Sequence, residues 1–540
     1  MAKQLTYRPL DNVGINGLNT QANPLTLDTT WLTRADNVVV KESGRLSSRK
    51  GLKQAIPTAS ANIGAIAEYD DNGTNKVFAS SGAYIYQINF SNPASAYNLS
   101  HNVSGAESDW QFINFNRKLY AVQSGQTPLE YSGSWSAFAN KPSGVTTFDP
   151  SCGMGYYGRL WVGGLTEAKD VVYYSDTLIG TEWAECSDPQ YTTQSTCEVS
   201  NTWTPRLTGY IDLKAVWGND DIVAIAPFYG QLVIFGKRNI VIYQNPDDPN
   251  NMALTEVIRG IGCVSRDSIQ AVGDDLIFVS DTGVRSLSRT SELDKVPLVD
   301  LSVNVKDTMI RDIGNSHNIK SCYVENEGVY IMSFTDKNIT YVLDMKHITP
   351  NRAPRITTWS FTNNREPSSM AFTKSQGFLV GQQAGSIATY EAYLDKDYVN
   401  SSTHTNHKYT SGFTTNWIEL GESVAASLLK KFKAVFSGGS GTSVGVKWYK
   451  DLEAAPYKSH TISLSPSTSG TPAYFGDAEF TSSSSSDTKY EFGEIFGLRE
   501  YSIPMSGSAK YLQIGMDTLV SGHSVSLQDL TLLFKQGKIR

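Results

Sequence analysis

The sequence is poor in the features that mark several common protein classes. Its 540 residues include only five cysteines at uneven spacing, which do not make a disulfide framework and fit folding in a reducing cytoplasm. No apolar run reaches the 18 residues that a spanning helix needs, and the N-terminal stretch lacks the apolar segment of a secretory signal. Charged residues make up 18% of the chain, and the net charge of −7 argues against a protein that wraps nucleic acid.

The residues that are abundant favour β structure. Hydrophobic residues reach 40% and aromatic residues 11%, which excludes wholesale disorder. Ala, Glu, Lys, Leu and Arg do not dominate, so a coiled coil is excluded as well. Tyr, Val, Ser, Thr and Gly are frequent, which is typical of strands and tight turns. We therefore expect an all-β protein.

A repeated unit supports that expectation. It consists of a short apolar strand, a turn of Gly, Ser, Asn or Asp, and a second short strand that often ends in Tyr. Its copies are separated by 41 to 53 residues, except for one gap of 72, which is the period of a β-propeller blade. The copies begin at Val77, Leu119, Leu160, Leu232, Leu276, Val329 and Phe378.

Further strand-like stretches precede most of these hairpins, beginning at Ile63, Trp110, Ile222 and Ile319. Each would supply the innermost strand of its blade. A closed ring covers both faces of every hairpin and leaves only short edges. We therefore expect a β-propeller of six to eight blades over residues 61–403. An array of β-sandwiches with the same spacing is the alternative.

The two ends of the chain differ from the blades. Residues 1–60 contain an extended arm and a hairpin, in which Asn37–Val40 and Arg45–Arg49 are strands joined by a turn that ends in Gly44. Residues 404–540 alternate between apolar and polar positions, with Val444, Val446 and Trp448 on one strand face. These regions predict an antiparallel β platform or sandwich built from both termini. Helical character is confined to Glu422–Phe432.

A polar insertion accounts for the long gap between repeats. It lies near residues 183–206, is flanked by Cys186 and Cys197, and lacks hydrophobic periodicity. We expect it to be a long surface loop projecting from one blade. The two cysteines are interpreted as unrelated thiols that would pair only after exposure to oxidant.

Motifs that carry chemistry are weak. His404 and His407 have a ligand-like spacing but lie in a polar linker without acidic or Cys neighbours. The acidic turn Asn245–Asn251 lacks a complete calcium loop, and the glycines after Gly438 lack dinucleotide-loop spacing and are expected to form a hairpin turn. Sialidase-like turns are matched only loosely, at Ser175–Gly180 and Ser280–Gly283. We expect no catalytic residue, metal site or cofactor, and an enzyme would rest on fold analogy alone.

Both ends carry short motifs that resemble one family, the tail nozzle proteins of short-tailed bacteriophages, also called tail tubular protein B or stabilisation proteins. The N-terminal match runs through Asn16–Thr20, Ala35–Val38 and the pattern Gly44, Arg45, Leu46, Arg49 and Gly51. The C-terminal match includes Thr415–Gly421, Lys430–Phe436, Val446–Asp451 and the final apolar-basic stretch. The insertion near 183–206 has no counterpart. The family-motif and interface candidates are Asn37, Gly44, Arg45, Leu46, Arg49, Trp417, Lys431, Lys447 and Trp448.

The resemblance implies a structural virion protein that forms a six-subunit ring at the distal end of a short tail. Its central bore would conduct phage DNA without specific binding, and the platform would dock onto the tail adaptor ring. Tail fibres or spikes and the host envelope are further expected contacts. The protein would assemble in the host cytoplasm. The alternative is a β-propeller interaction or host-adhesion module, with a glycan-processing enzyme behind it.

The negative net charge of the chain is compatible with a channel for DNA. Duplex DNA carries about one negative charge per 1.7 Å, so a basic bore would hold it back. Six copies at −7 each would carry −42 in total. We therefore expect the loops that face the bore to be neutral or acidic. Basic strand positions such as Lys430, Lys431 and Lys433 would instead face neighbouring subunits.

Overall fold

The computed structural model describes most of the chain. The described residues are 5–537 without 42–43, 72, 93–94, 184–197, 200–201, 204–207, 288–299, 315–317, 363–364, 394, 400–402, 422–425, 439–441, 465–470, 473–489 and 492–497. Cys186, Cys197 and most of the predicted insertion lie outside these residues. In the insertion the described residues are Trp183, which is buried in a core between blades, and the short strands β18 (Glu198–Val199) and β19 (Thr202–Trp203).

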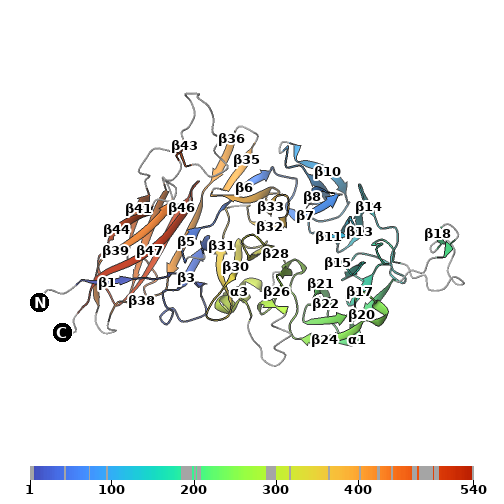
Figure 1. Ribbon diagram of the computed structural model, residues 1–540, viewed down its shortest axis with the longest axis horizontal. Coiled ribbons are helices and arrows are strands. Elements are labelled where there is room, and N and C mark those ends of the chain that lie inside the picture. The colour runs from blue at the N-terminus through green and yellow to red at the C-terminus, as the bar shows by residue number, and fades with distance from the viewer. Residues whose placement is uncertain are drawn as a thin grey trace.

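A β-propeller forms one half of the molecule, as predicted (Figure 1). Each of the seven repeated hairpins is the second and third strand of a blade, and the four expected upstream stretches are inner strands. The strands run, from inner to outer in each blade, as β7 (Ile63–Asp71), β8 (Thr74–Ser81), β9 (Tyr84–Ile88) and β10 (Tyr97–Asn102); β11 (Gln111–Phe115), β12 (Lys118–Gln123), β13 (Gln126–Tyr131) and β14 (Trp135–Ala137); β15 (Cys152–Tyr156), β16 (Arg159–Gly163), β17 (Val171–Tyr174) and β20 (Gly209–Asp212); β21 (Ile222–Phe228), β22 (Gln231–Gly236), β23 (Asn239–Gln244) and β24 (Ala253–Arg259); β25 (Gln270–Val272), β26 (Asp275–Ser280) and β27 (Gly283–Ser286); β28 (Ile319–Val324), β29 (Val329–Phe334), β30 (Ile339–Ile348) and β31 (Pro354–Trp359); and β32 (Pro367–Thr373), β33 (Gly377–Gln382), β34 (Ile387–Ala392) and β6 (Gly51–Ile56).

The ring closes through strands from both ends of the propeller sequence. Inner strand β32 packs beside β7, so the last blade meets the first. The outer strand of that last blade is β6, which pairs antiparallel with β34 although more than 300 residues separate them. Strand β6 falls within residues 1–60, which the sequence assigns to the platform. The N-terminal segment therefore also completes the propeller.

The other half is a sandwich of two sheets. One sheet contains β1 (Thr6–Pro9), β4 (Val38–Val40), β5 (Leu46–Ser48), β39 (Ser427–Gly438), β44 (Leu498–Pro504), β45 (Ser508–Ala509) and β47 (Val525–Lys535). The other contains β2 (Gly17–Leu18), β3 (Trp31–Asp36), β37 (Tyr409–Thr415), β38 (Ile418–Glu419), β40 (Thr442–Lys450), β41 (Lys458–Leu464) and β46 (Tyr511–Val520), and continues through β2 into blade strand β31. A hairpin of β35 (Asp395–Val399) and β36 (Thr403–His407) extends the last blade through a pairing with β6, and the pair β42 (Thr471–Pro472) and β43 (Tyr490–Glu491) stands apart.

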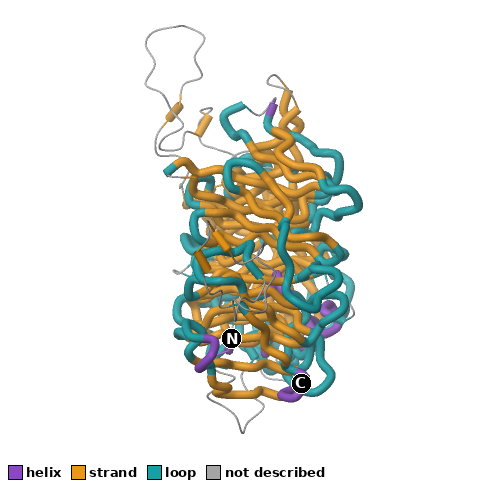
Figure 2. Tube along the Cα trace, turned by 90° about the vertical axis from the view of Figure 1, so that its right-hand side faces the viewer, coloured by secondary structure: helices purple, strands orange, loops and turns teal. Residues whose placement is uncertain are grey.

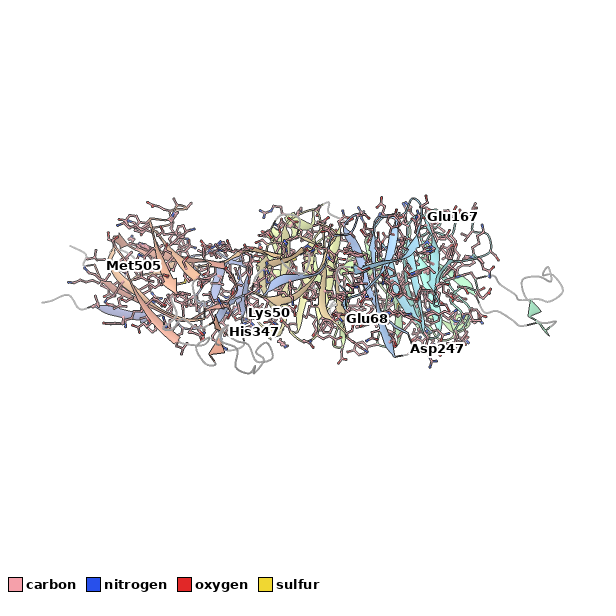
Figure 3. The ribbon with its side chains drawn as sticks, turned by 90° about the horizontal axis from the view of Figure 1, so that it is seen from above. Lys50, Glu68, Glu167, Asp247, His347 and Met505 are labelled. Atoms are coloured by element: carbon pink, nitrogen blue, oxygen red, sulfur yellow. The ribbon has the colours of Figure 1, made fainter. Side chains whose placement is uncertain are left out.

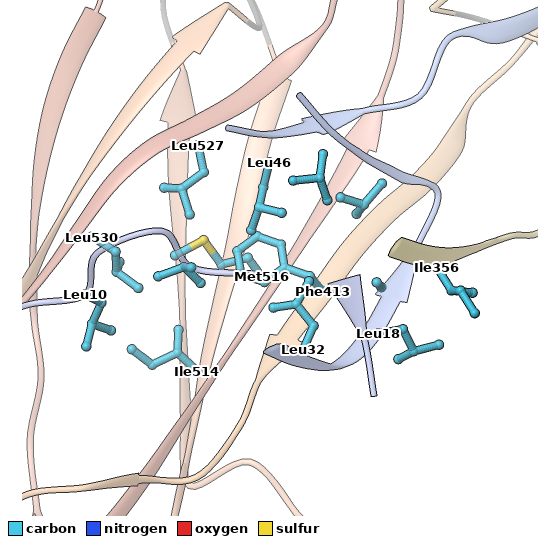
Figure 4. Close-up of a cluster of buried hydrophobic side chains, with 14 of the residues drawn as sticks. Leu10, Leu18, Leu32, Leu46, Ile356, Phe413, Ile514, Met516, Leu527 and Leu530 are labelled. Atoms are coloured by element: carbon cyan, nitrogen blue, oxygen red, sulfur yellow. The ribbon is translucent and has the colours of Figure 1, made fainter. Parts of the chain in front are cut away.

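The sandwich core comes from residues far apart in the sequence. Figure 4 shows Leu46 of β5 beside Leu527 of β47, with Phe413 and Met516 across from them. As predicted, Val444, Val446 and Trp448 all point into this core and are at most 3% exposed. The same cluster includes Val279 of blade strand β26, so the platform and the propeller share one core.

Helices are few and short in the described part of the chain (Figure 2). They are α1 (Lys214–Trp217), α3 (Lys306–Ile313) and the 3-10 turns η2 (Pro249–Asn251), η3 (Arg266–Ser268) and η4 (Val303–Val305). The expectation of a helix over Glu422–Phe432 is wrong, because Ser427 onward belongs to strand β39. A bulge accounts for the helix-like spacing of its apolar residues, because the pairing of β39 with β47 shifts register between Leu429 and Lys431. Within the described residues, no helix has the length and apolarity needed to cross a bilayer.

The prediction of a hairpin turn after Gly438 is wrong. Strand β39 pairs with β44, β45 and β47, whereas the next strand, β40, pairs with β41 and β46 of the opposite sheet. The strands on either side of residues 439–441 therefore belong to different sheets of the sandwich. The acidic turn at Asn245–Asn251 does form a local turn, in which the Asp248 carboxylate accepts a hydrogen bond from the Asn250 amide.

Candidate functional site

The predicted motif residues gather in the platform rather than in one pocket. Gly44 has φ of 79° in the turn of the β4–β5 hairpin, where the Lys41 amide donates to the Arg45 carbonyl at 2.9 Å. Leu46 fills the sandwich core, and Lys447 and Trp448 are neighbours on β40. Trp417 is half-buried, and its amide donates to Pro24 O. Asn37 and Arg49 contact each other through their side chains.

Asn37 is a buried connection between three segments. Its side-chain oxygen accepts from Arg49 Nε at 2.7 Å and from the Ser360 amide at 3.0 Å. Its side-chain nitrogen donates to Ser360 Oγ at 3.0 Å and to Thr410 O at 2.7 Å. Its φ of 55° is left-handed, a conformation that Asn tolerates better than most residues. Asn at this position therefore both tolerates the left-handed backbone conformation and supplies the donor and the acceptor of the hydrogen-bond network.

Arg49 is completely buried beside Asn37. Its Nη1 donates to Lys50 O at 2.7 Å and its Nη2 to Ser360 O at 3.1 Å. The guanidinium carbon lies 4.3 Å from the ring centroid of Tyr409, 4.8 Å from that of Phe361 and 5.6 Å from that of Trp359. An aromatic cage with carbonyl acceptors suits the planar, weakly hydrated guanidinium better than an ammonium group.

The junction cluster, as we call Asn37, Arg49, Trp359, Ser360, Phe361 and Tyr409, joins the propeller to the platform. Its members come from the N-terminal segment, from the end of blade strand β31 and from platform strand β37. The Tyr409 hydroxyl also donates to Arg49 O. The cluster holds a buried guanidinium between carbonyl oxygens and aromatic rings, and the Asp36 carboxylate accepts from Ser360 Oγ beside it, so its evident role is to fix the geometry of the junction.

The interface candidate Lys431 is exposed, and so is Lys430. Adjacent strand residues normally point to opposite faces, but the bulge in β39 leaves both lysines in solvent. Lys433 instead pairs with Glu500 at 2.6 Å, and this hydrogen-bonded ion pair raises the pKa of the lysine. Lys447 pairs with Asp517 at 2.9 Å. Two of the three basic positions on β39 are thus free to meet a partner.

A large axial cavity is the second candidate site. It has a volume of about 1240 Å³ and opens on the face where the connections between blades lie. Residues of every blade line it, including Gly64, Gln123, Ser151, Asn318 and Gln383. A smaller cavity of about 220 Å³ lies deeper among the inner strands.

Four charged residues lie between these two cavities and form an axial ion-pair cluster. Asp109 Oδ1 lies 2.8 Å from Arg266 Nη2 and 2.5 Å from Lys320 Nζ. Asp267 lies 3.3 Å from Arg266 Nε and 2.7 Å from Lys320 Nζ. Arg266 and Lys320 line both cavities, and Arg266 Nη1 also donates to Ser151 O at 2.5 Å. The cluster joins inner ends of blades on opposite sides of the ring and crosses the axis.

The charges in the cluster hold one another ionised. Burial alone would raise the pKa of Asp267, but Arg266 and Lys320 outweigh that effect and lower it. Burial would likewise lower the pKa of Lys320, and Asp267 and Asp109 raise it instead. Two cations and two anions leave no net charge. The arrangement is that of a structural crosslink across the axis.

Sequence reasoning missed this cluster. One signal was present, because Lys320 falls within the apolar inner strand that begins at Ile319, where an inward-pointing charge needs a partner. Among the described residues, no three His, Cys, Asp or Glu side chains are grouped as metal ligands would be. The side chains of His404 and His407 lie outside the described set, although the backbone of both belongs to strand β36.

Known proteins resemble this chain only distantly. No protein-family model matches the chain, and no curated protein matches it in sequence. Among solved structures, PorZ of Porphyromonas gingivalis, an essential bacterial surface component of the type-IX secretion system, is 12% identical with a TM-score of 0.37 over 69% of this chain and 44% of PorZ. The WD40 domain of Neurospora crassa Pan2 is 8% identical with a TM-score of 0.36 over 61% of this chain and 88% of that domain. The chain thus matches less than half the length of PorZ, and these likenesses carry no argument about function.

Proposed function

We propose that this chain is a structural subunit of the nozzle at the distal end of a short phage tail. It would assemble as a six-membered ring on the tail adaptor and surround a channel through which DNA is retained and then ejected. The observation that carries the proposal is the junction cluster. Asn37 and Arg49, two of the residues on which the family resemblance rests, bind the propeller to the platform.

The axial ion-pair cluster limits where such a channel would run. Asp109, Arg266 and Lys320 cross the propeller axis, so DNA would pass between subunits and not through each propeller. The exposed Lys430 and Lys431 on platform strand β39 support contacts between subunits or with the adaptor. A rigid junction would keep six propellers at a fixed angle to the ring.

Assembly is the test. We expect the full chain, mixed with the tail adaptor ring of the same virion, to give a six-copy ring by native mass spectrometry and electron microscopy. Lys430→Glu with Lys431→Glu is expected to weaken the ring, and Lys53→Glu, which reverses an exposed charge on propeller strand β6, is the control. A chain that stays monomeric with the adaptor present contradicts the proposal.

The open axial cavity favours a second candidate, an interaction or adhesion module. Its volume of about 1240 Å³ is large enough for a ligand, and its wall combines amides, hydroxyls and charges. A monomer that binds a host-surface component, and loses binding when Asn62 and Gln123 at the cavity wall are replaced by Leu, would support this alternative. Glycan turnover abolished by one carboxylate substitution would point to an enzyme.

A further inference from the structure

The face of the propeller opposite the axial cavity carries exposed apolar side chains. Turns between first and second strands, and between third and fourth strands, emerge on this face because blade strands are antiparallel. Figure 3 shows Asp247, from the β23–β24 turn, and Glu167, from the β16–β17 connection, at opposite edges of the molecule. Connections between third and fourth strands and those between second and third strands therefore lie on opposite faces of the propeller. We call Tyr157, Leu178, Ile179 and Tyr229 the aromatic turn patch.

The patch is exposed and continuous. Tyr157 is 48% exposed, Leu178 56%, Ile179 45% and Tyr229 67%. The Leu178 amide donates to Gly158 O at 2.6 Å, which brings the segment after β17 against the β15–β16 turn. A Cβ on Gly230 would lie 3.4 Å from Tyr157 Oη, so the turn that carries Tyr229 adjoins Tyr157. Contiguous exposed apolar groups of this kind mark interaction surfaces.

Three residues of the patch have a backbone conformation that is unusual for their type, although the Tyr157 ring packs against Tyr156 and the Tyr229 ring against Phe228. Tyr157, Leu178 and Tyr229 have φ of 44°, 62° and 45°, a left-handed conformation that disfavours bulky side chains. The corresponding β11–β12 turn has Asn116 with φ of 45°, a residue suited to that conformation. Tyr157 and Tyr229 therefore occupy turn positions that Asn would fill with less strain. Strain of this kind is typical of functional sites.

The surroundings of the patch are acidic. The turns of these blades and the next contribute Asp176, Asp247, Asp248 and Asp274. Two arginines lie nearby: the buried Arg159, which interacts electrostatically with Asp176 and Asp248, and the exposed Arg117 of the β11–β12 turn, next to Asn116, which donates to Leu178 O. These carboxylates therefore outnumber the nearby cations. Asp274 and Asp275 lie close enough to the Tyr229 hydroxyl to act on it electrostatically. Tyr ring faces attract cations, and carboxylates pair with them. The patch thus complements a positively charged partner.

We propose that the aromatic turn patch binds a Lys- or Arg-rich segment of a partner protein. Cationic groups would lie over the rings of Tyr157 and Tyr229 and pair with Asp247 and Asp274, while their alkyl stems would pack on Leu178. The inference goes beyond the nozzle proposal and does not depend on it, because it uses the propeller face alone.

The test uses the full chain and a fluorescein-labelled decapeptide of alternating Lys and Ser. A decapeptide of alternating Glu and Ser and the neutral glycan maltoheptaose serve as comparison probes. Fluorescence anisotropy is expected to detect the Lys peptide only, with binding that weakens as salt rises. Tyr157→Asn combined with Tyr229→Asn should weaken binding by about tenfold or more, since two cation–π contacts are lost.

The variants are chosen so that a result cannot be ascribed to unfolding. Asn suits both turn positions, so the thermal midpoint of the double variant should be unchanged or raised. Tyr210→Asn, at a tyrosine 61% exposed on the outer strand β20, should leave binding unchanged. Asp274→Asn should weaken binding and reduce its salt dependence. Failure of the Lys peptide to bind, equal binding to the double variant, or displacement by maltoheptaose would each overturn the proposal, the last in favour of a glycan site.

Discussion

The propeller and the junction that attaches it to the platform are built from opposite kinds of contact. Within most blades, strands pair with their neighbours along the chain, as in β22 with β23, where Leu232 faces Tyr243; the closing pair of β34 with β6 is an exception. At the platform, Thr6 pairs with Phe534, and Arg49 touches Tyr409. The propeller therefore depends on repeated local hairpins, whereas the junction depends on a few contacts between distant segments. The blade arrangement is repeated around the ring, whereas the junction between propeller and platform occurs once.

The largest expected effect comes from Arg49→Met, which removes the buried charge and its hydrogen bonds from the junction cluster. We expect a loss of about 3–5 kcal/mol in the free energy of unfolding, because Asn37 Oδ1 and Ser360 O lose a donor and the aromatic cage loses its cation. Chemical denaturation monitored by tryptophan fluorescence measures the change.

Arg238→Met is the matched control, since Arg238 is exposed on the propeller. It should change stability by no more than about 0.5 kcal/mol. Arg49→Lys should recover only part of the loss, because an ammonium group cannot reproduce the planar contacts. If Arg49→Met were as stable as Arg238→Met, the junction cluster would not hold the two halves together.

A smaller effect is expected within the propeller, from Asp267→Asn. The substitution leaves Arg266 and Lys320 with Asp109 as their one remaining charged partner in the axial ion-pair cluster. We expect a loss of about 1–3 kcal/mol at pH 7, less than at the junction because the side chains retain some solvent contact.

The pH dependence of that loss is specific. The pKa of Asp267 is lower in the folded protein than in the unfolded chain, so its ionised form stabilises the fold above its usual pKa of about 4. That contribution disappears as pH falls below 4 and the carboxylate is protonated. The stability difference between the two proteins should therefore be constant from pH 7 to about 5 and shrink below 4. A difference that persists unchanged in acid would mean that the charge of Asp267 is not responsible.

The same contrast explains how much could be predicted from the sequence. The blade hairpins were predicted because period, turn residues and apolar runs are local signals, and the face of Val444, Val446 and Trp448 followed from alternation. The closure of the ring by β6 was not predicted, because nothing in Gly51–Ile56 specifies a partner more than 300 residues away. The bulge that exposes both Lys430 and Lys431 also depends on pairing with β47.

For the junction cluster, the sequence pointed to two of the residues but not to the contacts that they make. Asn37 and Arg49 were selected as motif positions, and their contact with each other and with Ser360 required the fold. Charged residues in the axial ion-pair cluster come from three separate blades, so their pairing left no local pattern. The aromatic turn patch was hidden for another reason, since Tyr in a turn conveys nothing until its backbone conformation is known.

The smallest effect is expected at the platform surface, from Lys433→Ala. The ion pair of Lys433 with Glu500 is 2.6 Å long, but both side chains are more than one-third exposed, so water and salt screen the attraction. We expect no change in the unfolding midpoint that scanning calorimetry can resolve at 0.15 M salt. Lys431→Ala, at an exposed lysine on the same strand, is the comparison. If Lys433→Ala alone clearly lowered the unfolding midpoint, ion pairs on the platform surface would help to hold the sandwich together. Contacts between distant segments would then be less concentrated in the junction cluster than we propose.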